Sequence, residues 1–521
     1  MKIRLSTPIG IIGIMALFLC MITAAGGAQA APVKGGSITV GLNTDITAVD
    51  PHTTVAVVDA NVLGHVFEPL LAFGDNLDIH PVAAESWEVS PDYKTYTFRL
   101  IKGKAFHNGR EMTAEDVKYS IERVANPATK SPRASSFKVV DRIEIKDPYT
   151  VAIHLSEPNA TFGFSLADLN PVIAIVPKEE IEKQGGVFKH PIGTGPFKFV
   201  EWAPDRHVIL ERFDGYKGPK GSRDGLAGER IAYLDRIKFV PVPEESVSIM
   251  ALLNKEIDFL QYYPPAQVEK FRNDYSKRGL VLDEVTGLSW YQIFIGVTKP
   301  ITDNVKFRQA CAYAIDLGMV TQAAYSGNAK VNPSVIPPQS RFWTEYHNTW
   351  YKKDIGKAKQ LLKEAGYNGE EVVLDTTKKY AAMYRQAVAV HSELAAAGVN
   401  VKLNVVEWPV LIKKCSEGDF QMLSYGVGPM PNAAQAYSYL KRNKFDQVSP
   451  RIKEIWTAAE GTADLKMLQA LFAEAHKIQY EQVPWIQLYN YNYLQTFWNY
   501  VKGYQAINTG FIRFWGVWLK K

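Results

Sequence analysis

The chain has few cysteines, no long apolar run beyond its first 30 residues and no cluster of basic residues. Three cysteines in 521 residues exclude a disulfide-built scaffold, which would need several closely spaced pairs. We expect Cys311, which falls in a helical apolar pattern, to be a buried free thiol. A membrane-spanning helix needs about 20 apolar residues, and no segment after residue 30 supplies them. The formal charge of +5 includes no Lys/Arg run, so we expect no nucleic-acid partner.

Standard catalytic and cofactor-binding signatures are absent as well. The sequence contains no G-x-S-x-G elbow, no H-E-x-x-H pair and no Walker-A loop. His52, His65, His80 and His107 lie more than ten residues apart, so a metal site could form only by assembly in space. His107, in Phe-His-Asn-Gly, is better interpreted as a turn residue. We predict no enzyme activity, no metal and no cofactor.

Residues 1–30 have the pattern of an export signal. Lys2 and Arg4 give a positive start, residues 9–22 are apolar, and Ala28-Gln29-Ala30 provides the small-x-small cleavage pattern. The apolar part is shorter than a membrane span, although an N-terminal anchor is the alternative. We therefore expect an exported protein, cleaved near Ala30.

Strand and helix patterns alternate through the rest of the chain. Residues 372–375 and 401–406 have strand character, and the helical pattern at 384–397 connects them. A strand, a crossover helix and a second strand in this order form a parallel βαβ unit. The length is too great for one core, and the predicted class is α/β with more than one domain.

The segment 83–123 is the most regular stretch. Tyr96, Phe98 and Leu100 alternate with polar residues, which predicts a strand with one buried face. Thr113 and Asp116 have the spacing of a capping box, which predicts a helix start.

Aromatic residues make up 12% of the chain, and two of them stand at predicted strand ends. Tyr425 lies where a strand breaks into a Gly/Pro loop, and Trp408 follows the strand 401–406. Ligands bind at such loops in open α/β sheets, so we expect both side chains to contact a ligand, with core packing as the alternative.

Segment 83–123 resembles the hallmark stretch of the dipeptide/oligopeptide/opine/nickel class of periplasmic solute-binding proteins of ABC transporters (extracellular solute-binding protein family 5). The resemblance runs nearly end to end, with further matches in the same order at residues 191–199, 213–218, 307–316, 357–367 and 418–422.

This resemblance implies a two-lobed periplasmic-binding-protein fold of type II character, with lobes that close by hinge motion. The first lobe is then residues 31–64, 191–284 and 490–521, with an extra α/β subdomain at 65–190. The second lobe is residues 285–489, and Arg513 in the tail is structural.

The resemblance also implies where a ligand binds. Dipeptide-binding members hold the ligand carboxylate with an Arg that corresponds roughly to Lys378, which lacks the bidentate fork of an Arg. The Asp that holds a peptide amine has no counterpart, because no acid lies between Asp419 and Asp446. Asp45 could bind a ligand cation or cap a turn, and we weigh these equally. The candidate ligand-binding residues are Asn43, Thr44, Asp45, Lys378, Lys379, Tyr380, Trp408, Tyr425, Met430 and Asn432.

The predicted function is capture of a small organic solute in the periplasm and its delivery to ABC permease subunits by a monomeric receptor. Lys378 offers a cation to the solute, and the loop after residues 418–422 offers no acid. This combination favours a solute with a carboxylate and a hindered, modified or absent amine, such as an opine or a modified peptide. One alternative is an ordinary di- or oligopeptide receptor. A secreted hydrolase is the other.

Overall fold

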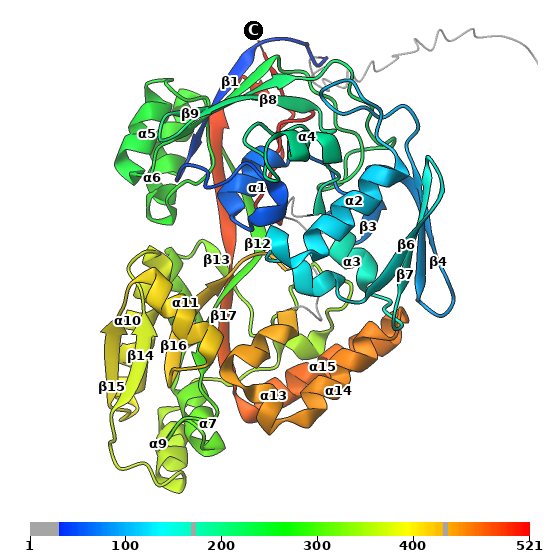
Figure 1. The fold of residues 1–521 in the computed structure, drawn as a ribbon. Coiled ribbons are helices and arrows are strands. Elements are labelled where there is room, and N and C mark those ends of the chain that lie inside the picture. The colour runs from blue at the N-terminus through cyan, green and yellow to red at the C-terminus, as the bar shows by residue number, and fades with distance from the viewer. Residues whose placement is uncertain (1–30, 168–172, 431–435, 521) are drawn as a thin grey trace, which may run out of the picture. The chain divides into compact units, whose positions relative to one another are not determined.

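The computed structural model describes residues 31–167, 173–430 and 436–520 (Figure 1). The predicted export signal and Asn432 lie outside these residues. Among the helices described, none is long and apolar enough to cross a membrane. The mixed α/β class predicted from the sequence is confirmed.

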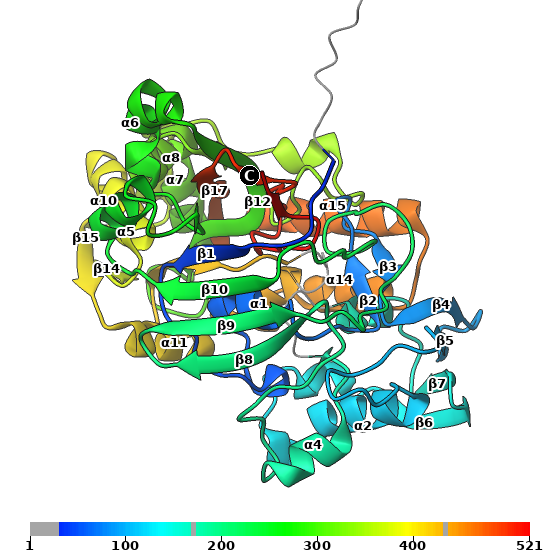
Figure 2. The same cartoon turned by 90° about the horizontal axis from the view of Figure 1, so that it is seen from above.

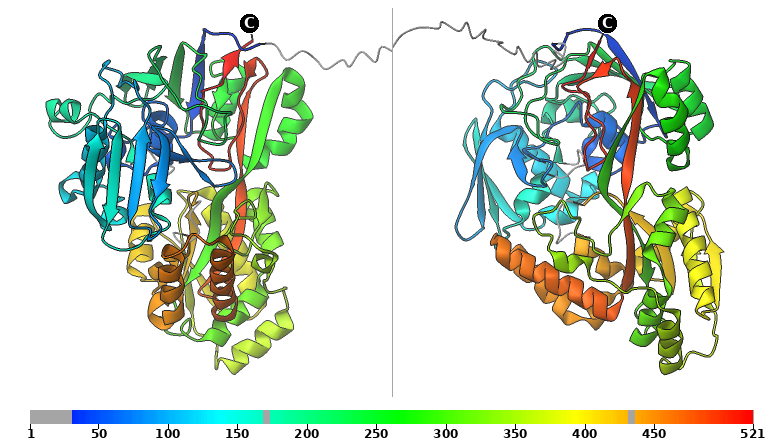
Figure 3. Two further views of the ribbon diagram at one scale, coloured as in Figure 1. Left: turned by 90° about the vertical axis from the view of Figure 1, so that its right-hand side faces the viewer. Right: turned by 180° about the vertical axis from the view of Figure 1, so that it is seen from behind.

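Two long antiparallel strands, β12 (Leu280–Ile295) and β17 (Trp485–Trp498), lie at the centre of the largest sheet (Figures 1 and 3). On one side of this pair follow β16, β14 and β15, and on the other β11, β1, β10, β9 and β8. Figure 2 shows β1, β10, β9 and β8 side by side in that order. The bounds of these strands are β16 Met422–Val427, β14 Val372–Thr376, β15 Val401–Val405, β11 Phe259–Leu260, β1 Ser37–Leu42, β10 Arg236–Pro241, β9 His207–Arg212 and β8 Phe197–Ala203.

A second sheet has four antiparallel strands in the order β4-β5-β7-β6. Its strands are β4 (Ala84–Val89), β5 (Thr95–Leu100), β7 (Thr150–Leu155) and β6 (Val140–Asp147), and α2 (Ala114–Ala125) packs on them. The buried face of β5 consists of Tyr96, Phe98 and Leu100, as the alternation predicts. The backbone N–H of Thr113 donates to Asp116 Oδ2 at 2.8 Å, so the predicted helix start is also confirmed.

The buried apolar residues fall into separate clusters. One extends from Trp290 to Tyr489, and another is built mainly on residues 60–175. A third combines residues 38–67, 174–239 and 497–517. The lobe and subdomain boundaries implied by the resemblance stay predictions.

The predicted βαβ unit is present, because β14 and β15 pair in parallel and α10 (Ala381–Ala396) connects them. Helix α7 spans Val305–Ala314. Its cap is Asn304, whose Oδ1 accepts from the backbone N–H groups of Lys306 and Phe307. Cys311 on this helix is a buried free thiol, as predicted.

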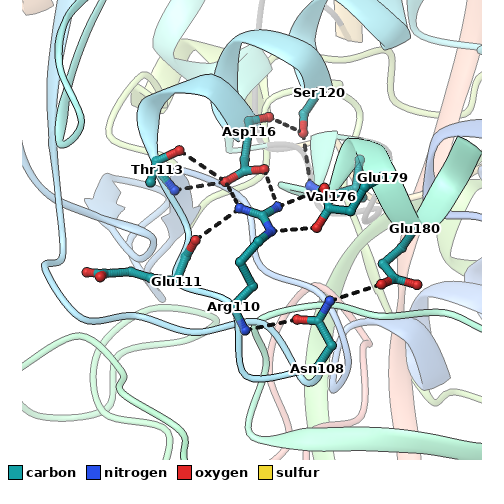
Figure 4. A network of polar contacts seen from close by, with 9 residues as sticks. All are labelled: Asn108, Arg110, Glu111, Thr113, Asp116, Ser120, Val176, Glu179 and Glu180. Atoms are coloured by element: carbon teal, nitrogen blue, oxygen red, sulfur yellow. Dashed lines mark hydrogen bonds and ion pairs between the residues drawn. The ribbon is translucent and has the colours of Figure 1, made fainter.

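Polar residues of segment 83–123 bind its neighbours (Figure 4). The Arg110 guanidinium donates to both oxygens of Asp116, at 3.0 and 2.6 Å, and also to Glu179 at the start of α4 (Lys178–Lys183). Ser120 Oγ, on α2, accepts from the backbone N–H of Val176 at 2.9 Å. These bonds attach α4, and the segment before it that contains Val176, to α2.

His107 joins the same segment to the glycine turn at 193–195. Gly193 N donates to His107 Nδ1 at 3.3 Å, and His107 Nε2 lies 3.0 Å from the Gly195 carbonyl. A Cβ on Gly193 would lie 2.1 Å from the Val66 carbonyl oxygen, and only glycine avoids that clash. His107 lies in a turn, as predicted.

Candidate ligand-binding site

Three of the predicted ligand-binding residues form a continuous row of rings, here called the aromatic run: Tyr380, Trp408 and Tyr425. The Tyr380 and Trp408 rings meet edge to face with centroids 4.9 Å apart. Trp408 stacks on Tyr425 at 5.9 Å with an interplanar angle of 19°. Residues that are 28 and 17 positions apart in sequence therefore make one surface.

The topology explains why these rings meet. Strand β14 runs parallel to both β15 and β16, so the carboxyl ends of the three strands lie at one edge of the sheet. Tyr380 precedes α10 after β14, Trp408 opens α11 (Trp408–Glu417) after β15, and Tyr425 lies near the end of β16. This is the edge where ligands bind in open α/β sheets.

The aromatic run changes from exposed to buried along its length. Tyr380 is 41% exposed, Trp408 is half-buried and Tyr425 is 9% exposed. Burial raises the pKa of the Tyr380 and Tyr425 hydroxyls, so both are neutral at ordinary pH. The run thus offers apolar area with neutral hydroxyl tips, a combination that suits an organic solute.

Lys378 and Lys379 lie on the exposed loop before Tyr380. Lys378 Nζ lies 5.3 Å from the centroid of the Tyr384 ring. The backbone N–H of Lys379 donates to Thr377 Oγ1 at 3.2 Å. Within the described ranges, neither ammonium group forms an ion pair, so both remain candidates for a ligand anion.

The loop after β1 has a different character. Asn43 and Thr44 are exposed, whereas the Asp45 carboxylate is bonded to the β8–β9 turn. Asp45 Oδ2 accepts from Trp202 Nε1 at 3.1 Å and from the Asp205 backbone N–H at 2.7 Å. The turn-capping interpretation therefore has direct contacts in its favour, and a ligand role for these three residues stays a prediction.

Met430, a candidate ligand-binding residue, and Arg513, expected to be structural, both pack against other side chains. Met430 is half-buried and packs against the cluster that contains Tyr425. Arg513 is buried, with its guanidinium 5.2 and 5.6 Å from the Phe511 and Trp515 rings, and burial together with the nearby Arg230 lowers its pKa to about 9. These contacts agree with the structural role expected for Arg513.

A second group of rings, here called the tyrosine cluster, was not predicted from the sequence. Tyr291 lies 5.3 Å from Tyr489 and 5.4 Å from Tyr491, and Tyr325 lies 5.3 Å from Tyr491. The alternation Tyr489-Asn-Tyr-Asn-Tyr493 is the sequence signal that would have indicated it. Tyr291 pairs with Gly426 on β16, the residue after Tyr425, so this cluster lies beside the aromatic run.

The tyrosine cluster surrounds an irregularity in the two long strands. The pairing of β12 with β17 shifts between Thr286 and Trp290. The Tyr493 ring fits there between two glycines, since a Cβ on Gly287 would lie 2.5 Å and one on Gly510 2.2 Å from it. A bulge of this kind interrupts the ladder and bends the strand.

Several residues that could act as metal ligands or nucleophiles are buried. No group of three or more His, Cys, Asp or Glu side chains that could hold a metal occurs in the part of the chain that the structure describes. His65 is buried, accepts from the Phe514 backbone N–H at 3.0 Å, and has its pKa lowered to about 3 by burial. Cys311 and Cys415 are buried thiols whose pKa is raised by burial.

Comparisons with known proteins show which family and which solved structures this chain is similar to. The model of the bacterial extracellular solute-binding proteins, family 5 (middle), matches residues 78–448. A glutathione-binding protein GsiB from Pectobacterium atrosepticum is 30% identical over 371 residues, which are 71% of this chain and 69% of that protein. The periplasmic binding protein DppA from Helicobacter pylori, in complex with the peptide STSA, superposes with a TM-score of 0.77 at 28% identity, covering 94% of this chain and 99% of that one. The binding protein AgaA in complex with agropinic acid, from A. tumefacien R10, shares the fold at a TM-score of 0.78 and 24% identity, covering 93% and 99%.

Proposed function

Because the chain belongs to family 5 of the bacterial extracellular solute-binding proteins, we propose that it captures a carboxylate-bearing organic solute and delivers it to an ABC importer. The site of action is the periplasm, after removal of residues 1–30. The receptor acts as a monomer and performs no covalent chemistry on the solute.

The observation that carries this proposal is the aromatic run at the carboxyl ends of β14, β15 and β16. Its rings would stack on the solute, and the Lys378 ammonium would hold a carboxylate. An ammonium point charge suits one oxygen of that group, whereas an Arg would take both. Tyr425 would lie deepest, because it is the most buried of the three rings.

The class of solute follows from the charges around the aromatic run. The sequence from 420 to 445 contains no Asp or Glu, so the loop after β16 offers no anchor for an amine. Burying an ammonium group without a carboxylate partner costs several kcal/mol. An opine-like compound or a peptide with a modified amine therefore fits better than an ordinary peptide. Glutathione keeps a free amine, and it is a further candidate only because relatives of this chain are named for binding it.

Capture would proceed by closure of two lobes about the irregularity in β12 and β17. The solute would bind the aromatic run in the open state and be enclosed when the strands flex near Thr286 and Trp290. The closed form would then present the surface that the permease recognises.

The test is mass spectrometry of whatever co-purifies with the exported protein, followed by a thermal-shift screen. The screen compares agropinic acid and glutathione with an ordinary dipeptide such as Met-Leu and with sugar acids. We expect the largest increase in melting temperature with agropinic acid or glutathione. A larger increase with Met-Leu would favour the ordinary peptide receptor, and turnover of a co-purified compound would favour the hydrolase.

A further inference from the structure

Arg513 is a buried cation without a carboxylate partner. Its side chain is 4% exposed, and its Nη1 donates to the Ile512 carbonyl oxygen at 2.7 Å. The guanidinium packs on the end of α1 (Val57–Leu63), where a Cβ on Gly64 would lie 2.5 Å from Arg513 Nη2. Among the residues that the structure describes, no Asp or Glu forms an ion pair with it. A buried charge of this kind is costly unless another group neutralises it.

A second guanidinium lies beside the same aromatic ring. The centroid of the Trp515 ring is 5.6 Å from Arg513 Cζ and 4.7 Å from Arg230 Cζ. Arg230 is 3% exposed, and its Nη1 donates to Glu68 Oε1 at 3.2 Å. One indole ring therefore contacts two buried cations, of which only Arg230 has an acidic partner.

Glu68 cannot neutralise both of these cations. Its carboxylate already accepts from four side chains, which are Lys104 Nζ at 2.5 Å, Tyr216 Oη at 2.7 Å, Thr194 Oγ1 at 2.8 Å and Arg230 Nη1. Lys104 is also fully buried. Three buried cations, Lys104, Arg230 and Arg513, therefore face one carboxylate, and this part of the interior carries an excess of positive charge.

Three N–H groups at this position have no hydrogen-bond acceptor within the described ranges. They are the buried groups Trp515 Nε1, Arg230 Nε and Asn61 Nδ2. Asn61 lies on α1 three residues before Gly64, and residues at this spacing share a helix face. Its Oδ1 accepts from the Ile512 backbone N–H at 3.0 Å, which fixes the orientation of the amide. All three groups are donors, so the group that satisfies them is an acceptor.

The histidine that contacts Trp515 does not supply this acceptor. The centroids of the His65 and Trp515 rings are 5.8 Å apart. His65 Nε2 accepts from the Phe514 backbone N–H at 3.0 Å, and Nδ1 lies 3.3 Å from the Val62 carbonyl oxygen, to which it can only donate. Both ring nitrogens are therefore occupied, and the imidazole is neutral.

We propose that a chloride ion binds between the Arg513 guanidinium and the Trp515 indole, with Arg230 Nε and Asn61 Nδ2 as further donors. A monovalent anion accepts several N–H bonds at once and also neutralises one positive charge. A buried water molecule would accept some of these bonds but leave the charge uncompensated. The ion would join α1 to Arg230 and to the C-terminal segment 512–515, and it would stabilise the fold whatever solute the protein carries.

The experiment measures the melting temperature of the mature protein in sodium chloride and in sodium methanesulfonate at equal ionic strength, so that screening is the same. The variants are Asn61→Asp and Trp515→Phe. The control is Asn273→Asp, at an exposed residue of η6 (Phe271–Tyr275). For wild type and the control, we expect a rise of about 1 °C for each tenfold increase in chloride once the site is half occupied.

The two variants at the cluster should respond differently from wild type. Asn61→Asp keeps the oxygen that accepts from Ile512 and adds a carboxylate oxygen where the amide nitrogen was. This variant should melt above wild type in methanesulfonate and lose the chloride effect, because it supplies the negative charge itself. Trp515→Phe keeps a ring beside both guanidinium groups but lacks the N–H donor, so it should need more chloride for the same rise.

Crystals of wild type grown in sodium bromide locate the ion, because bromide gives an anomalous signal. We expect a bromide peak within hydrogen-bond distance of Arg513 and Trp515. Equal melting temperatures of wild type in the two salts, with no bromide peak at this cluster, would overturn the proposal. A chloride effect that persists in folded Asn61→Asp would overturn the assignment of the ion to this cluster. If Asn61→Asp does not fold, the position of bromide in wild type decides.

Discussion

Trp408 stacks on Tyr425 at 5.9 Å with an angle of 19° between the ring planes. The two residues come from the ends of different strands, and Tyr425 also contacts Phe294 at 5.9 Å. The aromatic run is therefore already packed against Phe294 before a solute arrives. Preformed aromatic surfaces of this kind dominate binding free energy because little conformational freedom is lost on association.

Replacement of Trp408 by Ala should weaken solute binding by about 2 kcal/mol, or roughly 30-fold in Kd, since an aromatic anchor is lost. Trp408→Phe should retain most of the affinity because it keeps a ring on Tyr425. Calorimetry with the solute identified in the thermal-shift screen checks both variants. The control is Trp87→Ala, a half-buried tryptophan on β4; an equal loss there would contradict a specific role for Trp408.

Lys378→Ala should weaken binding of a carboxylate solute at least tenfold, because the ammonium group has no protein anion to pair with in the described ranges. Lys379→Ala should have a smaller effect, and Lys363→Ala, an exposed residue on α9 (Ile355–Glu364), should have none. Calorimetry with glutathione and agropinic acid provides the measurement. Unchanged affinity in Lys378→Ala would rule out this anchor.

Much of the architecture could be predicted because periodicity reports burial directly. The alternation of β5 and the βαβ unit of β14, α10 and β15 follow from local patterns. The meeting of Tyr380, Trp408 and Tyr425 follows from one further step, that parallel strands end at the same edge of a sheet. These predictions need only the local sequence pattern and the rule that two strands joined by a crossover helix pair in parallel.

The tyrosine cluster could not be predicted in the same way. Tyr291, Tyr325 and Tyr491 come from three separate segments, and no local pattern shows that these segments meet.

Acidification should destabilise the protein between about pH 6.5 and 4. Burial lowers the pKa of His107 to about 4, so the unfolded chain, with a pKa near 6.5, binds this proton first as pH falls. The stabilisation is therefore complete above pH 6.5 and is lost toward pH 4, at up to about 1.4 kcal/mol per pH unit. His52, His65 and His476, whose pKa values are also lowered by burial, act in the same direction.

Melting temperatures of wild type and His107→Gln, recorded at intervals from pH 7 to 4.5, measure the contribution of this one imidazole. We expect a shallower fall for His107→Gln, because Gln does not titrate in that range. His190→Gln, at an exposed histidine, should retain the wild-type slope. Identical slopes for all three proteins would show that His107 stays neutral or that its protonation is tolerated.

Glu68→Gln should destabilise the fold by about 3–5 kcal/mol, the range for breaking a buried ion pair. The carboxylate is fully buried, and it accepts from Lys104 Nζ at 2.5 Å, from Arg230 Nη1 at 3.2 Å and from Tyr216 Oη at 2.7 Å. Lys104, from segment 83–123, is itself fully buried.

The Lys104 ammonium would lose its counter-ion in Glu68→Gln. Adding Lys104→Met removes that charge and should restore at least half of the lost stability. For a chain of this length the single variant should lower the melting temperature by about 4 °C, measured by calorimetry at pH 7. A double variant no more stable than Glu68→Gln alone would show that Lys104 is stabilised by packing and not by this charge.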